Sequence, residues 1–347
     1  MTSSNSVAII GAGIAGLSCA TALQNAGAEV TLFEKSRGVS GRLSTRVTDY
    51  WQCDHGAQYF TARDSLFHDE VQRWIDHAVA QEWQPLLKVF DGYTFLKKDN
   101  DSNTTRYVGY PKNNAPAKFL AKELHVVSET TVVGIHKQAG KWLINGMEHG
   151  IYPGRFDDVI LAIPAPQAGT LLKNTTSDLL HICNAVIMRP CFALMLQYDY
   201  TIPCQFDGLF IQAGLLSWVA RDSAKPGRKV ASSRSSDVWV LHATAEWSAL
   251  HVNDDRERIA QIMLSEFNHL LMVDASIQAS AHALIAPKSQ SLHRWLYADA
   301  EKYLTDICHY DTSQRIGICG DWTNGGKVQG AWLSGLHLAK QLITEHK

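Results

Sequence analysis

Residues 6–34 read SVAIIGAGIAGLSCATALQNAGAEVTLFE, and this stretch decides the fold. The pattern predicts a short apolar strand over 6–10, a helix over 14–26 and a second strand over 29–33. The connections are short, and a strand, a helix and a strand in that order typically open a parallel sheet. We therefore expect a mixed α/β chain that begins with a Rossmann-type unit.

Three glycines between the first strand and the helix, Gly11, Gly13 and Gly16, form the pattern GxGxxG. Gly11 permits a tight turn, Gly13 lets the backbone approach a pyrophosphate, and Gly16 lets the helix pack closely on the strand. The first helical residues, Ile14 and Ala15, would present free N–H groups and the positive end of the helix dipole to phosphates. The stretch predicts a dinucleotide site; the alternative is a glycine-rich turn that binds nothing.

Glu34 ends the second strand, where a carboxylate can accept hydrogen bonds from a ribose and disfavours a 2′-phosphate. The segment EKSRGVSGRLSTR over 34–46 then contains a second glycine–arginine turn. This turn can bring a guanidinium and backbone amides to the far side of the same pyrophosphate, which an NAD-dependent dehydrogenase does not need. FAD is therefore expected, with a basic surface loop as the alternative. The candidate ligands in this segment are Lys35, Arg37, Gly41 and Arg42.

Near the C-terminus, residues 319–335 read CGDWTNGGKVQGAWLSG and follow an apolar strand. Asp321 is expected to bond a ribityl or ribose hydroxyl, and Trp322 to pack on the ribityl chain or the flavin ring. A helix that begins near Gly330 and Ala331 would aim its N–H groups at the pyrimidine edge of the flavin, where negative charge develops on reduction. An ordinary capped terminal helix explains Gly330 but not the Gly-Asp turn before it.

The middle of the chain gives a coarser pattern. A polar, Pro/Gly/Ser-rich stretch over 221–237 predicts a long surface loop. Helices are predicted over 65–83 and 254–272, a meander of three short strands over 131–136, 141–145 and 157–163, and further strands over 191–198, 208–213 and 237–244.

Composition narrows the function classes. The chain has 347 residues, a formal net charge of -2 and scattered lysines and arginines, so nucleic acid is not an expected partner. It shows no apolar run long enough to span a bilayer and no signal peptide, which predicts a cytoplasmic protein. Seven cysteines without a CxxC pattern predict reduced, mostly buried thiols. None of the histidines has ligand spacing, so no metal is predicted.

Other stretches carry a resemblance to a known family. They include DHGAQYFTARD over 54–64, LHATAEWS over 241–248 and HRWLYA over 293–298. With the dinucleotide motifs at both ends, the chain resembles the flavin-containing amine-oxidase-type enzymes and, more closely, the bacterial renalases. The resemblance extends over nearly the whole chain, from residue 8 to residue 336.

The resemblance implies an architecture of the p-hydroxybenzoate hydroxylase type with noncovalent FAD. A discontinuous FAD-binding domain would comprise 1–62, 124–165 and 311–347. An inserted substrate domain with an antiparallel sheet would comprise 63–123 and 166–310.

The resemblance also implies a reaction. Renalases oxidise the 2-dihydro and 6-dihydro isomers of NAD(P)H to NAD(P)+ and pass the electrons to O2, which gives H2O2. Two alternatives stay open: an amine oxidase acting on a small amine, and a dinucleotide-binding protein without catalytic activity. No protein partner is implied.

This chemistry needs stacked rings rather than a strong acid or base, because the product is an aromatic pyridinium. The candidate residues are therefore aromatic or hydrogen-bonding. His242 would hold the substrate carboxamide or the flavin edge, and Arg221 a phosphate or carboxamide. Gln58 and Tyr59 would line the flavin face, and Trp295 the pocket. The alternatives are core packing for His242 and Tyr59, and a loop salt bridge for Arg221.

Overall fold

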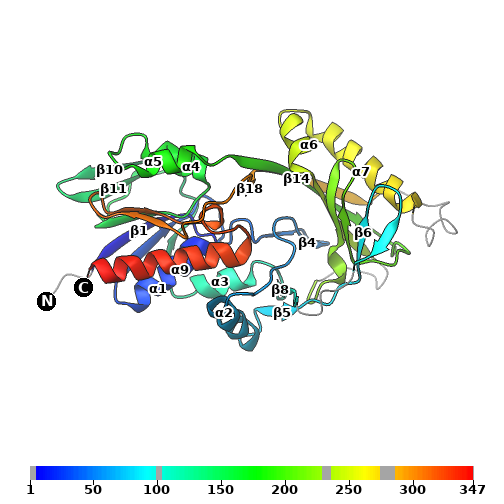
Figure 1. The fold of residues 1–347 in the computed structure, drawn as a ribbon, viewed down its shortest axis with the longest axis horizontal. Coiled ribbons are helices and arrows are strands. Elements are labelled where there is room, and N and C mark those ends of the chain that lie inside the picture. Colours follow the sequence, from blue (N-terminus) through cyan, green and yellow to red (C-terminus); the bar gives the residue numbers. More distant parts are fainter. Residues whose placement is uncertain (1–4, 99–103, 229–235, 274–285, 347) are drawn as a thin grey trace.

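The elements of the computed structural model gather in two lobes, joined by the long strands β14 (Met188–Tyr198) and β18 (Ser289–Ala300) (Figure 1). The structure describes residues 5–98, 104–228, 236–273 and 286–346. Within these ranges, no helix has the length and apolar character that crossing a bilayer requires. All seven cysteines are free, four of them buried, as predicted for reduced thiols.

A six-stranded sheet forms the centre of the first lobe. In it β1 (Ser6–Ile10) pairs in parallel with β2 (Glu29–Phe33) on one side and with β13 (Asp158–Leu161) on the other, so the predicted β-α-β unit is confirmed. Only the edge strand β19 is antiparallel to its neighbour. The order is β19 (His309–Asp311), β20 (Ile316–Ile318), β13 (Asp158–Leu161), β1 (Ser6–Ile10), β2 (Glu29–Phe33) and β9 (His125–Val127).

Helices α1 (Ile14–Asn25) and α9 (Lys327–Glu345) lie side by side on one face of this sheet (Figure 1). Gly335 permits their close approach, because a Cβ atom there would lie 2.0 Å from the carbonyl oxygen of Ala15. The first and last segments of the chain therefore share one core.

Helix α2 (Ser65–Asp76) packs on the same core and is shorter than the predicted helix over 65–83. It ends because Ala78 takes a left-handed backbone conformation with φ of 55°, and the N–H of Val79 turns back to the carbonyl of Trp74. The chain then continues as β5 (Ala80–Glu82), which pairs with β8 (Tyr107–Gly109) before α3 (Ala115–Ala121).

The opposite face of the six-stranded sheet carries α4 (Ala165–Leu172), α5 (Leu179–Asn184) and a small sheet (Figure 1). The predicted meander is partly wrong. Its third strand, β13, joins the main sheet, because β13 is buried throughout and pairs with β1 and β20. The small sheet comprises β10 (Val132–Gln138), β11 (Lys141–Gly146) and β12 (Gly150–Ile151).

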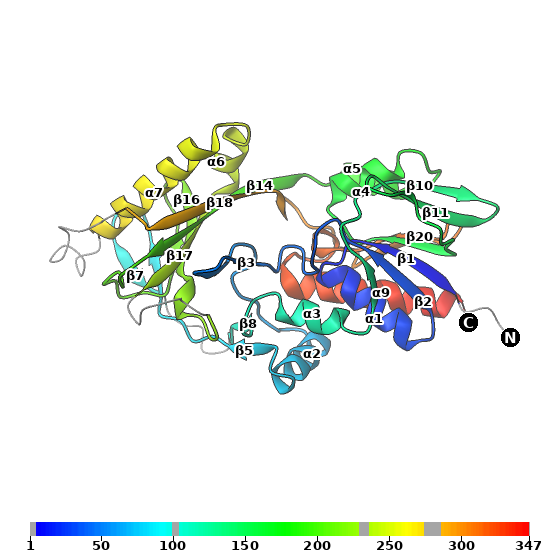
Figure 2. The same ribbon diagram turned by 180° about the vertical axis from the view of Figure 1, so that it is seen from behind.

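A seven-stranded sheet forms the second lobe, and it is antiparallel except where β15 (Gly208–Ile211) pairs in parallel with β6 (Leu87–Phe90). Helices α6 (Ala245–Leu250) and α7 (Arg256–Val273) cover its outer face, and the hairpin of β3 (Thr45–Val47) and β4 (Gln52–Asp54) lies toward its inner face (Figure 2). The order is β18, β14, β17 (Asp237–Ala243), β16 (Leu216–Arg221), β15 (Gly208–Ile211), β6 (Leu87–Phe90) and β7 (Phe95–Lys97).

The division into two domains stays a prediction, and the packing moves its boundaries. Helices α2 and α3 fall in the expected substrate segment 63–123, but their apolar faces join the core of α1 and α9. Helices α4 and α5 begin the expected segment 166–310, and they pack on the six-stranded sheet. The inserted lobe is therefore essentially the seven-stranded sheet with its two helices.

Candidate cofactor and substrate site

The glycine loop after β1 has the shape expected for a phosphate site. Gly11 has φ of 101°, and a Cβ atom there would meet the carbonyl oxygen of Ala162 at 2.6 Å. A Cβ atom at Gly16 would lie 2.0 Å from the carbonyl oxygen of Gly11. At Gly13, which caps α1, nothing lies within 4 Å of that position. The loop is therefore closed against the protein at two glycines and open at the third, where a phosphate would approach.

The second glycine–arginine turn packs against this loop. A Cβ atom at Gly41 would lie 3.4 Å from the Cα atom of Gly13, and Ser40 forms a β-bridge with Gly13. Arg42 then reaches across to Asp321, with which it forms two hydrogen bonds, and to the carbonyl of Ala298. Two motifs 279 residues apart in sequence therefore meet through one ion pair beside the glycine loop.

Glu34 is buried at the end of β2, where its carboxylate accepts hydrogen bonds from the N–H groups of Ala12 and Ser36. This fixes the carboxylate beside the glycine loop, at the place expected for the ribose. Lys35 and Arg37 are exposed in the segment that follows.

The C-terminal motif keeps its expected place with two corrections. Helix α9 begins at Lys327, and Gly330 lies in its first turn, where a Cβ atom would be 2.0 Å from the carbonyl oxygen of Asn324. Ala331 follows, packed against the core. Trp322 is fully buried in the core of the six-stranded sheet and donates to the carbonyl of Ile163. Trp322 therefore anchors the Gly-Asp turn instead of packing on a flavin.

A turn over residues 54–60 joins the hairpin β3–β4 to the first lobe. The carbonyl of Arg42 accepts a hydrogen bond from the N–H of Ala57, and a Cβ atom at Gly56 would lie 1.9 Å from it. The side-chain amide of Gln58 donates to the carbonyl oxygens of Asp54 and Gly56. Gln58 therefore braces its own turn rather than lining the flavin face.

A row of histidines and aromatic rings crosses the inner face of the seven-stranded sheet. Ala193 of β14 pairs with His242 of β17 on one side and with His293 of β18 on the other. Trp218 of β16 pairs with His242 on its other side. Directly paired residues point to the same face, so these side chains lie together as one row. Val238 and Val240 share this face with His242, as predicted.

The turn over 54–60 lies along this row and contacts both of its ends. The ring of His55 stacks on Trp295 with centroids 5.3 Å apart, and Trp295 donates its indole N–H to the carbonyl of His55. Tyr59, half-buried, lies 6.0 Å from Trp218, measured between ring centroids. Of the expected pocket residues, the structure thus brings together His242, Trp295 and Tyr59.

His242 of this row and His55 of the turn are both neutral at physiological pH. Burial, helped by Lys225, lowers the pKa of His242 to about 4, against a hydrogen bond to the His55 backbone. Burial, with His293 and Arg46 beside it, lowers the pKa of His55 to about 3. The Nε2 atom of His242 and the Nδ1 atom of His55 are buried without a hydrogen-bond partner. Neutral imidazoles with free nitrogen atoms can donate to or accept from a bound ligand.

Arg221 lies elsewhere, which corrects its expected role. Its guanidinium donates to the carbonyl of Ile202, lies 3.5 Å from the carboxylate of Asp237 and rests 5.1 Å from the ring centre of Trp239. Trp239 belongs to the core between the sheet and α7, on the opposite face from His242. Arg221 therefore has the structural salt bridge that was its alternative.

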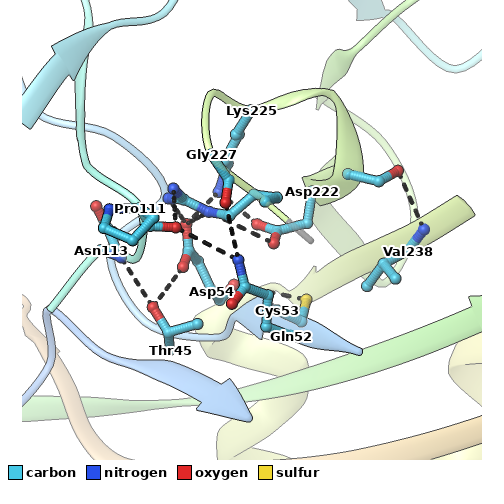
Figure 3. A network of polar contacts seen from close by, with 12 residues as sticks. Thr45, Gln52, Cys53, Asp54, Pro111, Asn113, Asp222, Lys225, Gly227 and Val238 are labelled. Carbon is cyan, nitrogen blue, oxygen red and sulfur yellow. Dashed lines mark hydrogen bonds and ion pairs between the residues drawn. The ribbon is translucent and has the colours of Figure 1, made fainter. Parts of the chain in front are cut away.

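The segment after β16 was predicted to lie on the surface, and its first part is buried instead. Asp222, Lys225 and Arg228 meet Asp54 of β4 in one cluster, where each side chain is at most 1% exposed (Figure 3). Two carboxylates and two cations are thus enclosed together. The remainder of the predicted loop, residues 229–235, lies outside the described residues.

The pKa values of the two carboxyl groups in this cluster shift in opposite directions, because their environments differ. Burial raises the pKa of Asp54, but Lys225 and Arg228 outweigh it, so the pKa lies below its ordinary value. Burial and the nearby Asp54 raise the pKa of Asp222 to about 6. Thr45 also donates a hydrogen bond of 2.7 Å to Asp54. The cluster therefore holds Asp54 firmly as an anion.

Sequence reasoning missed His55, His293, Asp54 and Lys225. His55 and Asp54 lie in the stretch DHGAQYF, and His293 precedes Trp295 by two residues, so the motifs contained the signal. For Lys225 the sequence contains no such signal, because a lysine in a Pro/Gly/Ser-rich stretch is usually exposed. Among the described residues, no three His, Cys, Asp or Glu side chains gather as a metal ion would require.

Comparison with known proteins gives two family matches. The pattern of NAD(P)-binding Rossmann-like domains matches residues 9–78, and that of flavin-containing amine oxidoreductases matches residues 94–343. The second match alone spans more than half of the chain.

Individual relatives match over short stretches. A 4,4'-diapophytoene desaturase (4,4'-diaponeurosporene-forming) from Staphylococcus haemolyticus is 34% identical over 102 residues, which are 28% of this chain and 20% of that protein. An L-amino-acid oxidase from Siganus canaliculatus is 34% identical over 89 residues, which are 25% of this chain and 16% of that protein. The chain thus spans a fifth or less of the length of these curated relatives.

Solved structures match over the whole chain. A protein assigned as a protoporphyrinogen oxidase from Exiguobacterium sp. 255-15 superposes with a TM-score of 0.77 at 13% identity, over 99% of this chain and 100% of that chain. A triple mutant of a putrescine oxidase superposes with a TM-score of 0.67 at 12% identity, over 99% of each chain. At these identities the likeness concerns the fold alone.

Proposed function

The chain belongs to the flavin-containing amine oxidoreductase family, and from that premise we propose that it is an FAD-dependent oxidase of dihydronicotinamide dinucleotides. It would oxidise the 2-dihydro and 6-dihydro isomers of NAD(P)H to NAD(P)+. Overall, one substrate, one O2 and one proton give one NAD(P)+ and one H2O2. The renalase-like stretches of the sequence imply this reaction.

The residues that surround the glycine loop fit FAD. The open position at Gly13 leaves room for a pyrophosphate, and Glu34 stands beside the loop for the ribose. The ion pair of Arg42 and Asp321 joins the two motifs that would hold the cofactor. The segment over 321–335 contains no cysteine, which favours noncovalent binding. When bound, FAD supplies the hydride acceptor.

The observation that carries the proposed substrate is the row on the inner face of the seven-stranded sheet. Its rings and neutral histidines suit an uncharged dihydropyridine ring, which needs stacking and a hydrogen bond to its carboxamide. Burial lowers the pKa of these histidines, and the cations Arg46 and Lys225 add to that effect, so the imidazoles stay uncharged. Uncharged imidazoles provide no counter-ion for a protonated amine, whereas they can hydrogen-bond a carboxamide.

The roles that follow are specific. His242 would hydrogen-bond the carboxamide through its free Nε2 atom. Trp295 and Tyr59 would enclose the ring from the two ends of the row, and exclude water from it. No side chain has to remove a proton, because loss of hydride leaves an aromatic pyridinium.

The test is anaerobic mixing of the purified, flavin-loaded protein with 6-dihydro-NAD, while the flavin absorbance is followed. We expect fast bleaching, NAD+ as the product and H2O2 when air is readmitted. Bleaching no faster than with ordinary NADH would exclude the proposed substrate. A panel of small amines run in parallel would then test the amine-oxidase alternative.

A further inference from the structure

Lys225 follows the seven-stranded sheet in the chain, but its ammonium group lies against the turn over 54–60, on the opposite side of the site. After β16, the chain turns through a short helix (Asp222–Ala224) toward the hairpin β3–β4 (Figure 3). The Nζ atom of Lys225 lies 3.1 Å from a carboxylate oxygen of Asp54, 3.1 Å from the side-chain oxygen of Gln58 and 2.7 Å from Asp222. The first two contacts are hydrogen bonds and the third is an ion pair.

The contact with Gln58 connects Lys225 to the shape of the turn over 54–60. Gln58 accepts from Lys225 through its oxygen and donates its NH₂ group to the carbonyls of Asp54 and Gly56, at 2.7 Å and 3.1 Å. Every polar atom of this side chain is therefore used. Without Lys225, the buried oxygen of Gln58 would lose its partner, and the turn would lose one of its braces.

The turn over 54–60 contacts both the cofactor site and the row that would bind the substrate. On one side, Ala57 and Gly56 pack against the backbone of Arg42, whose guanidinium pairs with Asp321 in the cofactor site. On the other side, His55 stacks on Trp295 at the end of the substrate row. Movement of this turn would therefore change the distance between cofactor and substrate.

We propose that Lys225 is a positioning residue for hydride transfer, which acts through Gln58 and Asp54 to hold the turn over 54–60 between cofactor and substrate. Lys225 itself touches neither reactant. For its kinetic test the inference rests on the proposed function. A displacement of about 1 Å at a reacting centre can cost on the order of 100-fold in rate.

If Lys225 only stabilised the fold, the reaction rate of each variant would follow its stability. Variants that differ in buried charge can distinguish this role from positioning. Lys225→Met removes one of two cations and leaves an excess of buried negative charge, so the protein should be less stable. The double variant Lys225→Met/Asp222→Asn leaves one carboxylate and one cation and restores neutrality. Gln58→Met removes the link to the turn without changing any charge.

We expect both Lys225 variants and Gln58→Met to slow flavin reduction by 6-dihydro-NAD about 100-fold. The urea midpoint should drop in Lys225→Met and recover in the double variant. Lys288→Met is the matched control, because Lys288 forms an exposed ion pair with Asp199 and should change neither property. Recovery of rate together with stability in the double variant, or a normal rate in Gln58→Met, would overturn the proposal.

A second readout needs no substrate. The amide hydrogens of Ala57 and Phe60 are bonded to the carbonyls of Arg42 and Tyr107, so their exchange with solvent reports on the turn. In the FAD-bound protein, the double variant and Gln58→Met should exchange them at least about tenfold faster, and unchanged exchange would contradict the proposal. If 6-dihydro-NAD fails to reduce the unmodified protein, the proposed substrate is wrong, and exchange alone decides the role of Lys225.

Discussion

Ser40 occupies a backbone conformation that normally belongs to glycine. Its φ is 127°, it is 5% exposed, and its N–H donates to the carbonyl of Ala12 within the cofactor loop. A non-glycine residue in such a region costs on the order of 1–3 kcal/mol. The surrounding turn therefore holds a strained residue beside Gly13, where the flavin pyrophosphate would lie.

We predict that Ser40→Gly raises the free energy of unfolding of the apoprotein by roughly 1–3 kcal/mol, because glycine relieves this strain. Urea denaturation would measure the gain. Ser36→Gly is the control, because Ser36 is exposed and its φ is not positive, so the change should cost up to roughly 1 kcal/mol. If both variants lost stability, Ser40 would not be strained in solution.

The buried histidines make stability depend on pH in a defined direction. An unfolded histidine has a pKa near 6.5, whereas the pKa values of His242 and His293 are about 4 and that of His55 is about 3. Between these values the unfolded chain binds more protons than the folded chain. The contribution of these neutral histidines to the free energy of unfolding is therefore complete above about pH 6.5, and it is lost as the pH falls toward 4.

We predict that the urea midpoint falls between pH 7 and pH 5, and that His242→Gln makes this fall smaller. The raised pKa of Asp222 acts in the opposite direction, because a buried carboxylate is easier to keep when protonated. The comparison is therefore between variant and parent at each pH. An equal loss of stability in both proteins would mean that His242 is not buried in its neutral form.

At the residue scale, prediction from sequence succeeded where one motif contains both the residue and its reason. Gly11 and Gly16 need no distant partner to be interpreted, and Glu34 follows directly from its strand. Lys225 and Trp322 failed because their surroundings come from segments more than 150 residues away. Local polarity suggested a surface position for Lys225, and the motif suggested a flavin contact for Trp322.

The segment over 222–228 is the element that sequence reasoning misplaced most clearly. Its composition predicts a loop, and its charges predict exposure. The segment does lack regular structure beyond one turn of 3-10 helix, but the expected exposure is wrong, because Asp54 and the carbonyls of Gly109 and Pro111 supply partners for the enclosed guanidinium of Arg228. A buried polar segment is stable only when such partners exist, and composition cannot reveal them.

Gly227 tests whether this segment is docked in solution. It has φ of 73°, and a Cβ atom there would lie 2.6 Å from the ring of Tyr110 and 2.8 Å from Pro111. Gly140 has φ of 79° with nothing within 4 Å, so it is a matched control. We predict that Gly140→Ala costs about 1–2 kcal/mol from the backbone alone, and that Gly227→Ala costs at least about 1 kcal/mol more. Equal losses in urea denaturation would mean that the segment is not packed there.

At the scale of the whole molecule, the sequence predicts the type of each of the two large sheets but not the order of their strands. The opening β-α-β unit predicted the parallel sheet. The strands predicted over 191–198, 208–213 and 237–244 all fall in the second sheet, and the resemblance implied that this sheet is antiparallel. The order of strands could not be read from sequence. In particular, β17 and β18 lie on opposite sides of β14, and only that order brings His242 and His293 into one row.

The cofactor site draws on both ends of the chain, so FAD should protect both together. We predict that FAD slows backbone hydrogen exchange over 11–16, 40–46 and 320–332, and leaves α7 unchanged as an internal control. Exchange of the apoprotein and the flavin-loaded protein, followed by mass spectrometry, would measure it. Protection confined to the first segment would indicate a ligand that spans only the glycine loop.

This shared sheet has a consequence for how the protein is made. A ribosome delivers β1 and α1 first, whereas β20, Asp321 and α9 emerge only after the entire second lobe. The nascent chain therefore carries only part of the FAD site through most of its synthesis, and the face of α1 that packs on α9 stays uncovered. A translating chain halted before β20 lacks Asp321 and α9, so we expect it to hold FAD too weakly to be coloured.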